Sequence, residues 1–123
     1  MPAALASRRR DLGAHGEDLA ARWYQERGFA VLDRNWRCPQ GEIDIVARKD
    51  DVLVFSEVKT RTSDLFGEPF EAVGPAKQRK LRRLASAWLR TTPAGVERRR
   101  FFTVRFDVVS VTPEALSVIE AAF

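Results

Sequence analysis

The stretch VLVFSEVKTR, residues 52–61, indicates the fold more clearly than any other part of the chain. Side chains alternate along a β-strand, so Leu53 and Phe55 share one face with Glu57 and Lys59, while the opposite face carries valines and a serine. Both faces begin apolar, which is typical of a central strand covered on both sides. The sequence therefore predicts a buried strand whose far end carries an acid and a base.

Patterns on either side of this stretch predict the remaining elements. A helix is expected from Asp11 to Arg27, strands over 29–37 and 42–48, a loop over 60–74, a helix beginning at Pro75, a strand over 101–111 and a short helix beginning at Pro113. Such an order predicts an α/β or α+β fold in which helices pack on a mixed β-sheet. At 123 residues the chain is long enough for one domain, with residues 1–10 expected to form a flexible arm.

Composition limits the classes of function. Lys and Arg number 21 against 17 Asp and Glu, a net charge of +4 that favours polyanionic partners. Cys38 is the only cysteine and His15 the only histidine, so a zinc site or a Ser-His-Asp triad is not expected, and metal chemistry would depend on carboxylates. The single cysteine and the lack of a bilayer-length apolar stretch predict a cytoplasmic protein without a membrane partner.

The acid and base at the strand end have two interpretations. Taken alone, Glu57 and Lys59 form a solvated ion pair worth at most about 1 kcal/mol. The preceding strand changes this balance, because a hairpin at the KDD turn would place Asp44 level with Glu57, on the side opposite Ile43 and Ile45. Two carboxylates and an ammonium would then meet, and Mg²⁺ or Mn²⁺ takes such oxygen ligands. A neighbouring lysine can orient a water and offset charge that develops on a phosphate.

The order of Asp44, then Glu57 and Lys59 within SEVK, resembles the PD-(D/E)XK nuclease superfamily, in which an acid on one strand precedes an E-x-K on the next. Four segments, HGEDLAARWYQERGF, NWRCPQGEIDIVARKDDVLVFSEVKTR, FGEPFEAVGPAKQRKL and RFDVV, together resemble the YraN-like family of bacterial proteins. That family is similar to Holliday-junction resolvases. The resemblance covers roughly Gly16 to Val109 and implies a restriction-endonuclease-like fold.

The resemblance also implies roles for individual residues. Asp44, Glu57 and the carbonyl of Val58 would hold Mg²⁺ or Mn²⁺, and Lys59 would assist the attacking water. Glu17, on the first helix, matches an acid that many such nucleases place beside the metals, although it would otherwise be a surface acid near a helix start. Ile43 stands where the superfamily name has proline.

Basic and polar residues provide candidate contacts to nucleic acid. Lys77 and Gln78 match a position where related nucleases direct a polar side chain to the phosphate, although a lysine in a basic helix is usually solvated. The remaining basic residues are expected to act as a group. They would form a basic stripe that contacts phosphates, which would make the binding of nucleic acid depend on salt concentration. The expected contacts are Arg61, Lys77, Gln78, Lys80 and Arg83. Glu42 is expected beside Asp44, and His15 is interpreted as a helix-start residue rather than a ligand. Asp107 is interpreted as a structural partner of Arg105 or of a neighbouring lysine.

Three functions are compatible with these residues. The first is a metal-dependent endonuclease that acts on DNA, including branched DNA, for which a homodimer would suit a symmetric substrate. The second is a catalytically silent nucleic-acid-binding module of the same fold. The third is an interaction protein whose basic face contacts an acidic protein. The complete set of Asp44, Glu57 and Lys59 favours the enzyme.

Overall fold

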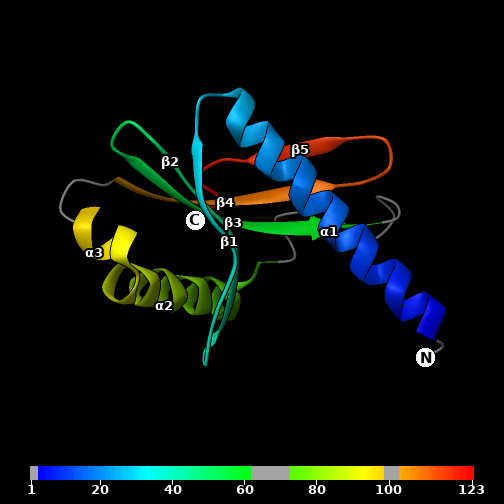
Figure 1. The fold of residues 1–123 in the computed structure, drawn as a ribbon, viewed down its shortest axis with the longest axis horizontal. Helices are drawn as coiled ribbons and strands as arrows, with labels where there is room; N and C mark the ends of the chain where they lie inside the picture. The colour runs from blue at the N-terminus through cyan, green and yellow to red at the C-terminus, as the bar shows by residue number, and fades with distance from the viewer. Residues whose placement is uncertain (1–2, 62–72, 99–102) are drawn as a thin grey trace.

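The chain is described from a computed structural model, which covers the backbone of residues 3–61, 73–98 and 103–123 and, from residue 14 onward, their side chains except at residue 98. The elements follow one another along the chain as shown in Figure 1. They are α1 (Ala3–Glu26), β1 (Ala30–Cys38), β2 (Gly41–Lys49), β3 (Val52–Thr60), α2 (Pro75–Thr91), α3 (Pro93–Arg98), β4 (Thr103–Val111) and β5 (Leu116–Ile119). Most of the loop expected over 60–74 lies outside the described residues.

The five strands form one sheet in the order β1-β2-β3-β4-β5. All neighbours are antiparallel except β3 and β4, which run parallel and are connected across α2 and α3. A parallel pair needs such a crossover, because the chain must return to the end at which β3 began. The fold class predicted from the sequence is confirmed, since this is an α/β fold with a mixed sheet and flanking helices, consistent with a restriction-endonuclease-like arrangement.

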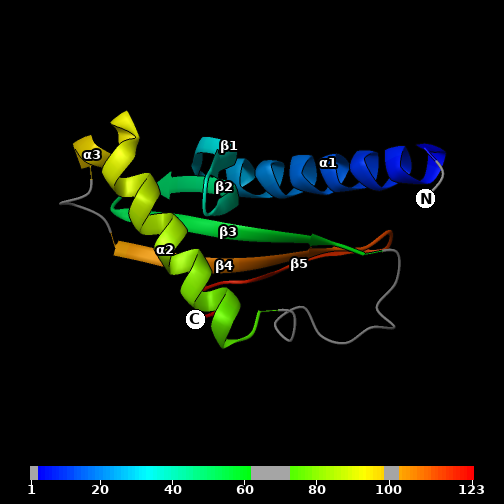
Figure 2. The same ribbon diagram turned by 90° about the horizontal axis from the view of Figure 1, so that it is seen from below.

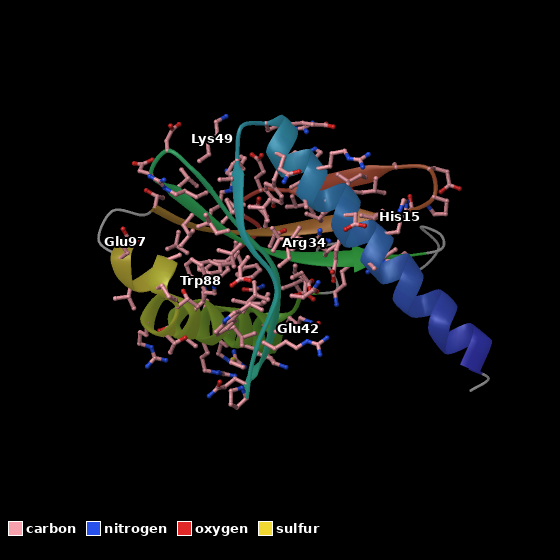
Figure 3. All side chains as sticks on the ribbon, in the orientation of Figure 1. His15, Arg34, Glu42, Lys49, Trp88 and Glu97 are labelled. Carbon is pink, nitrogen blue, oxygen red and sulfur yellow. The ribbon has the colours of Figure 1, made fainter. Side chains whose placement is uncertain are left out.

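Strand β3 lies at the centre of the sheet and is buried on both faces, as its alternating sequence predicts. Phe55 packs beneath α2, where its ring meets that of Trp88 with 5.6 Å between centroids. Val54 faces the other way, into a second cluster that includes Tyr24 of α1. Figure 2 shows α1 running along the sheet, and Figure 3 shows Trp88 between α2 and the strands. The two helices therefore stabilise opposite faces of one sheet.

The hairpin of β1 and β2 departs from the rest of the sheet. Pairing between β2 and β3 is regular from Lys49 to Ile45, which lies opposite Ser56, and residues nearer the hairpin tip pair only with β1. The tip extends toward α2 (Figure 1), and Ile43 packs into the cluster beneath that helix whereas Ile45 packs beneath α1. The expectation that both isoleucines share a face is therefore wrong, because β2 leaves β3 between them.

Helix α1 is longer than the sequence pattern indicated. It begins at Ala3 rather than Asp11, so residues 3–10, for which a flexible arm was expected, are helical. Alanine, leucine and arginine are strong helix formers and dominate this segment. Its first turns extend beyond the sheet in Figure 1. None of the helices in the described part of the chain is both long and apolar enough to cross a lipid bilayer.

The expectation of a short terminal helix that begins at Pro113 is wrong. Pro113 lies in the turn between β4 and β5, where the main-chain N–H of Thr112 donates to the carbonyl of Ala115 at 2.8 Å. Leu116 and Val118 alternate into the cluster beneath α1, which is the period of a strand. Only four residues long, β5 gave too short a pattern to recognise.

A buried polar network joins α1 to the centre of the sheet. The Tyr24 hydroxyl donates to Oδ2 of Asp107 at 2.7 Å and lies 3.1 Å from the Ser56 hydroxyl. Arg105 contacts both Asp107 oxygens at 2.9 and 3.0 Å, which confirms the expected structural partnership, and the N–H of Ala121 donates to Oδ1. Burial, followed by the charge of Asp107, raises the pKa of Tyr24 well above its usual range. The network fixes the strand that carries Glu57 against α1 and β4.

Candidate functional site

Asp44 and Glu57 come together where β2 and β3 separate. Because Ile45 lies opposite Ser56, the next position on each strand places Asp44 beside Glu57, as the hairpin count predicts. Each residue is only 8% exposed. Both line one pocket of about 270 Å³ that opens between the hairpin tip and α2. Two buried carboxylates in one pocket require compensation from hydrogen bonds or from cations.

A main-chain hydrogen bond fixes Asp44. The N–H of Val58 donates to Oδ2 of Asp44 at 2.7 Å. At this level β2 no longer pairs with β3, so the carboxylate takes the place of a main-chain carbonyl as acceptor. The N–H and C=O of one strand residue point to the same edge, so the carbonyl of Val58 is also directed to the side of Asp44. Asp44, Glu57 and this carbonyl are hard oxygen donors, and they fit Mg²⁺ or Mn²⁺.

The electrostatic surroundings of Asp44 favour a bound cation. Burial raises its pKa to about 7, the Val58 hydrogen bond opposes this shift, and the charges of Glu57, Glu17 and Glu42 add to it. This carboxyl is hard to ionise first because it is buried and second because three acids lie near it, and both effects disfavour its negative charge in the absence of a nearby cation. A divalent cation at this position would stabilise that charge.

Two lysines already contact Glu57. Lys59 Nζ lies 3.1 Å and Lys77 Nζ 2.9 Å from the same oxygen, Oε1. Lys59 shares the face of Glu57 on β3, as the alternation predicts. Partial burial lowers the pKa of Lys77, but the hydrogen bond and charge of Glu57 outweigh it, so the pKa lies above its ordinary value. The ammonium of Lys77 lines the pocket, whereas Lys59 is not among the residues that line it.

Hairpin and helix come close on the far wall of the pocket. Gly41 has φ of +145°, and a Cβ at this position would lie 3.0 Å from Cε of Lys80, so glycine allows the lysine to cross it. Glu42, which is labelled in Figure 3, lines the same pocket, as expected from its position beside Asp44, and it accepts a 3.0 Å hydrogen bond from Arg37. The wall therefore carries both positive and negative charge.

The acid expected on the first helix is near the site without lining it. Glu17 is half-buried on α1, and its charge contributes to the raised pKa of Asp44, but it does not line the pocket. Among the described residues, no three His, Cys, Asp or Glu side chains gather closely enough to hold an ion. A metal here would thus depend on Asp44, Glu57 and the Val58 carbonyl. His15 is exposed on α1 and does not line the pocket.

The expected nucleic-acid contacts divide into two groups. Lys77 and Lys80 line the pocket. Gln78 does not line it, and its amide donates to the carbonyl of Val73 at 3.0 Å, just before the start of α2. Arg83 is exposed on α2 outside the pocket, and Arg61 continues from β3, with its main-chain N–H donating to Val111.

The contact between Lys77 and Glu57 is the feature that sequence reasoning missed. The sequence indicated Lys77 only as a phosphate contact at the start of a basic helix. Its distance from Glu57 depends on how α2 returns across the sheet after the long loop, which no local pattern specifies. The aromatic contacts of Arg82, whose guanidinium lies 5.0 Å from the Phe106 ring, were missed for the same reason.

Known proteins are similar to this sequence over most of its length. A family model described as "Uncharacterised protein family UPF0102" matches residues 16–111. A UPF0102 protein of Rhodococcus opacus (strain B4) is 52% identical over 100 residues, which are 81% of this chain and 80% of that protein. A UPF0102 protein of Acidothermus cellulolyticus is 50% identical over 114 residues, 89% of this chain and 86% of that protein. The matched range includes the two carboxylates of the site and the two lysines that contact Glu57.

Proposed function

This chain belongs to the Uncharacterised protein family UPF0102, the YraN family whose motifs its sequence carries, and we propose that it is a metal-dependent endonuclease acting on DNA. One observation carries the proposal. Asp44 and Glu57, both buried, line one pocket, and the Val58 N–H holds the first while two lysine ammonium groups contact the second. A purely structural ion pair has no need of a second acid whose pKa is raised to about 7 beside it.

The residues divide the chemistry of phosphodiester hydrolysis among themselves. A Mg²⁺ or Mn²⁺ ion held by Asp44, Glu57 and the Val58 carbonyl would acidify the attacking water and stabilise the leaving oxygen. Lys59, which is directed to Glu57 from the same strand, orients the water and offsets negative charge on the phosphate. Lys80 and Lys77 on the pocket wall attract the DNA backbone.

A second candidate is the catalytically silent nucleic-acid-binding module. It is favoured by the engagement of Glu57 with two lysines at once, an arrangement in which the carboxylate is already neutralised. In that case, the basic pocket wall would bind DNA and the acids would serve only to position the lysines. Cleavage assays distinguish the two functions directly.

The test compares four proteins on three substrates. Wild type, Asp44→Asn, Glu57→Gln and the control Asp18→Asn are incubated with supercoiled plasmid, single-stranded DNA and a four-way junction, in Mg²⁺, in Mn²⁺ and in EDTA. Asp18 lies on α1, is exposed and pairs with Arg34, so its replacement changes charge near the fold's surface without touching the pocket.

We expect cleavage by wild type and Asp18→Asn in either metal, none in EDTA, and a loss of at least about a hundredfold in the two pocket variants. Equal cleavage by wild type and Asp44→Asn would exclude this site and point to a contaminating nuclease. Binding of DNA without cleavage of any substrate would instead establish the silent module.

A further inference from the structure

We propose that Lys77 and the divalent cation compete for Glu57, so that metal loading releases the lysine toward the phosphate of the substrate. The inference rests on the proposed function, because it assigns a metal to the pocket of Asp44 and Glu57. It adds a residue on α2 whose position depends on whether the metal is bound. Lys77 then acts as a positioning residue in one state and as a substrate contact in the other.

The competition follows from the positive charge already gathered at one carboxylate. Lys77 Nζ lies 2.9 Å from Oε1 of Glu57, and Lys59 Nζ lies 3.1 Å from the same oxygen. A magnesium ion binds carboxylate oxygen at about 2.0–2.1 Å and demands an unobstructed octahedral shell. Two ammonium groups and a divalent cation around one carboxylate oxygen repel each other strongly in a partly buried pocket. This repulsion favours the departure of one lysine when the ion enters.

Lys77 is the lysine that can leave. It begins the helix α2 on the opposite wall of the pocket, its side chain is 37% exposed, and it lines the cavity into which it would swing. Lys59 is two residues from Glu57 on the same face of a central strand, so its backbone stays beside that carboxylate, whereas Lys77 reaches the carboxylate from a different element. The four-carbon stem of a lysine allows the ammonium of Lys77 to turn without a change in the backbone.

The released ammonium would strengthen phosphate binding. Lys77 turns from Glu57 into the pocket that Lys80 also lines, which places two positive charges beside the ion. Metal and DNA therefore favour each other, since each binds better once Lys77 has left Glu57. In the metal-free protein, the same lysine neutralises Glu57 and lowers the cost of its burial.

The test measures Mn²⁺ affinity by isothermal titration calorimetry, without DNA. The proteins are wild type, Lys77→Met, Lys77→Arg and Lys80→Met, each first shown by circular dichroism to be folded. Lys80 lines the same pocket, but the ion pairs that the structure describes for Glu57 are with Lys59 and Lys77. Lys80→Met therefore controls for a general loss of positive charge from the pocket. Lys77→Arg retains a cation at position 77 and so retains the competitor.

We expect Lys77→Met to bind Mn²⁺ about fivefold or more tightly than wild type, Lys77→Arg to remain within about twofold of wild type, and Lys80→Met to gain clearly less than Lys77→Met. A wild-type crystal soaked in Mn²⁺ should show Lys77 Nζ beyond 4 Å from Glu57 Oε1.

Two results would overturn the proposed exchange between Lys77 and the metal, and they distinguish its failure from failure of the proposed function. Equal Mn²⁺ affinity in wild type and Lys77→Met, or equal gains in Lys77→Met and Lys80→Met, would refute the exchange and leave a metal site in place. Failure of wild type and of Lys77→Met to bind Mn²⁺ would refute the metal site itself, and the exchange with it.

Discussion

The main-chain N–H of Val58 donates a 2.7 Å hydrogen bond to Oδ2 of Asp44, across a gap where their two strands no longer pair. A backbone donor on a central strand holds this carboxylate in place without the help of any ion. The site is therefore formed in advance of ligand binding, and its geometry depends on the sheet. The cost of this arrangement is a buried acid among other acids, which makes stability depend on pH.

We expect Asp44→Asn to stabilise the metal-free protein above neutral pH. The pKa of Asp44 is raised from an ordinary 3.8 to about 7, so ionisation is easier in the unfolded chain than in the folded one. Below pH 4 the carboxyl is protonated in both states and nothing is lost, whereas stability falls as the pH rises from 4 to 7. At pH 8 the variant should gain about 2 kcal/mol in free energy of unfolding, less than the full shift implies.

Urea denaturation in EDTA at pH 4, 6 and 8 measures this dependence. Asparagine retains an oxygen that accepts the Val58 N–H, so the hydrogen bond survives the change. Asp18→Asn, at an exposed position, should show no such trend. A variant less stable than wild type at pH 8 would contradict the raised pKa.

Tyr24→Phe should destabilise the fold by about 1.5–3 kcal/mol, because it removes a hydrogen bond to a buried carboxylate. Asp107 keeps Arg105 and the Ala121 N–H, which limits the loss. Thr91→Ala, which removes a hydroxyl bonded to a carbonyl of its own exposed helix, is the control and should change little. Guanidinium denaturation at pH 7 provides the measurement, and a change below about 0.5 kcal/mol would show that the network contributes little.

Gly16→Ala should have opposite effects in two backgrounds. A Cβ at Gly16 would collide with the hydroxyl of Thr60, at the point where α1 crosses the end of β3. In wild type we expect a loss of about 1–3 kcal/mol from this overlap. In a Thr60→Ala background the hydroxyl is gone and the nearest remaining atom is the Cβ of residue 60, at 3.2 Å, so the higher helix propensity of alanine should make the same change neutral or slightly stabilising, by less than about 1 kcal/mol. A double-mutant cycle of thermal unfolding tests this, and additive effects would argue against the contact.

If Lys80 contacts the DNA backbone, Lys80→Met should lower the salt dependence of binding. Each phosphate contact contributes about 0.9 to the slope of log K against log salt, so the slope should decrease by about one. Arg90→Met is the matched control, because this substitution removes the same charge from the other end of α2. There the Arg90 side chain donates a hydrogen bond to the carbonyl of Ser86. Fluorescence anisotropy of a labelled duplex in EDTA gives both slopes without cleavage. Equal decreases would mean that the helix binds DNA diffusely rather than at the pocket.

The sequence was sufficient for the centre of the sheet. Val54 and Phe55 face opposite clusters because alternation in a strand is strict, and a tight turn between two strands determines which residues lie level. The approach of Asp44 to Glu57 follows from those two rules alone. Local periodicity thus predicted the two carboxylates and Lys59, which lie on adjacent strands.

What the sequence did not provide depends on contacts between distant segments. Lys77 reaches Glu57 only because α2 returns across the sheet, and Gln78 turns its amide to the carbonyl of Val73, the residue before the Gly74 N-cap. Ile43 follows the hairpin tip to α2 once β2 leaves β3. The strand at Leu116 was missed because four residues show too little alternation to outweigh a proline nearby.

The order in which β3 acquires its neighbours affects how the chain is made. β2 precedes β3 and pairs with it immediately, but the parallel partner β4 begins only at Thr103. Until the ribosome has released that segment, the central strand of the sheet presents an open edge along its whole length, which is a template for association with other nascent chains. Protection of that edge during synthesis, by a chaperone or by rapid completion of the chain, is therefore a requirement of this topology.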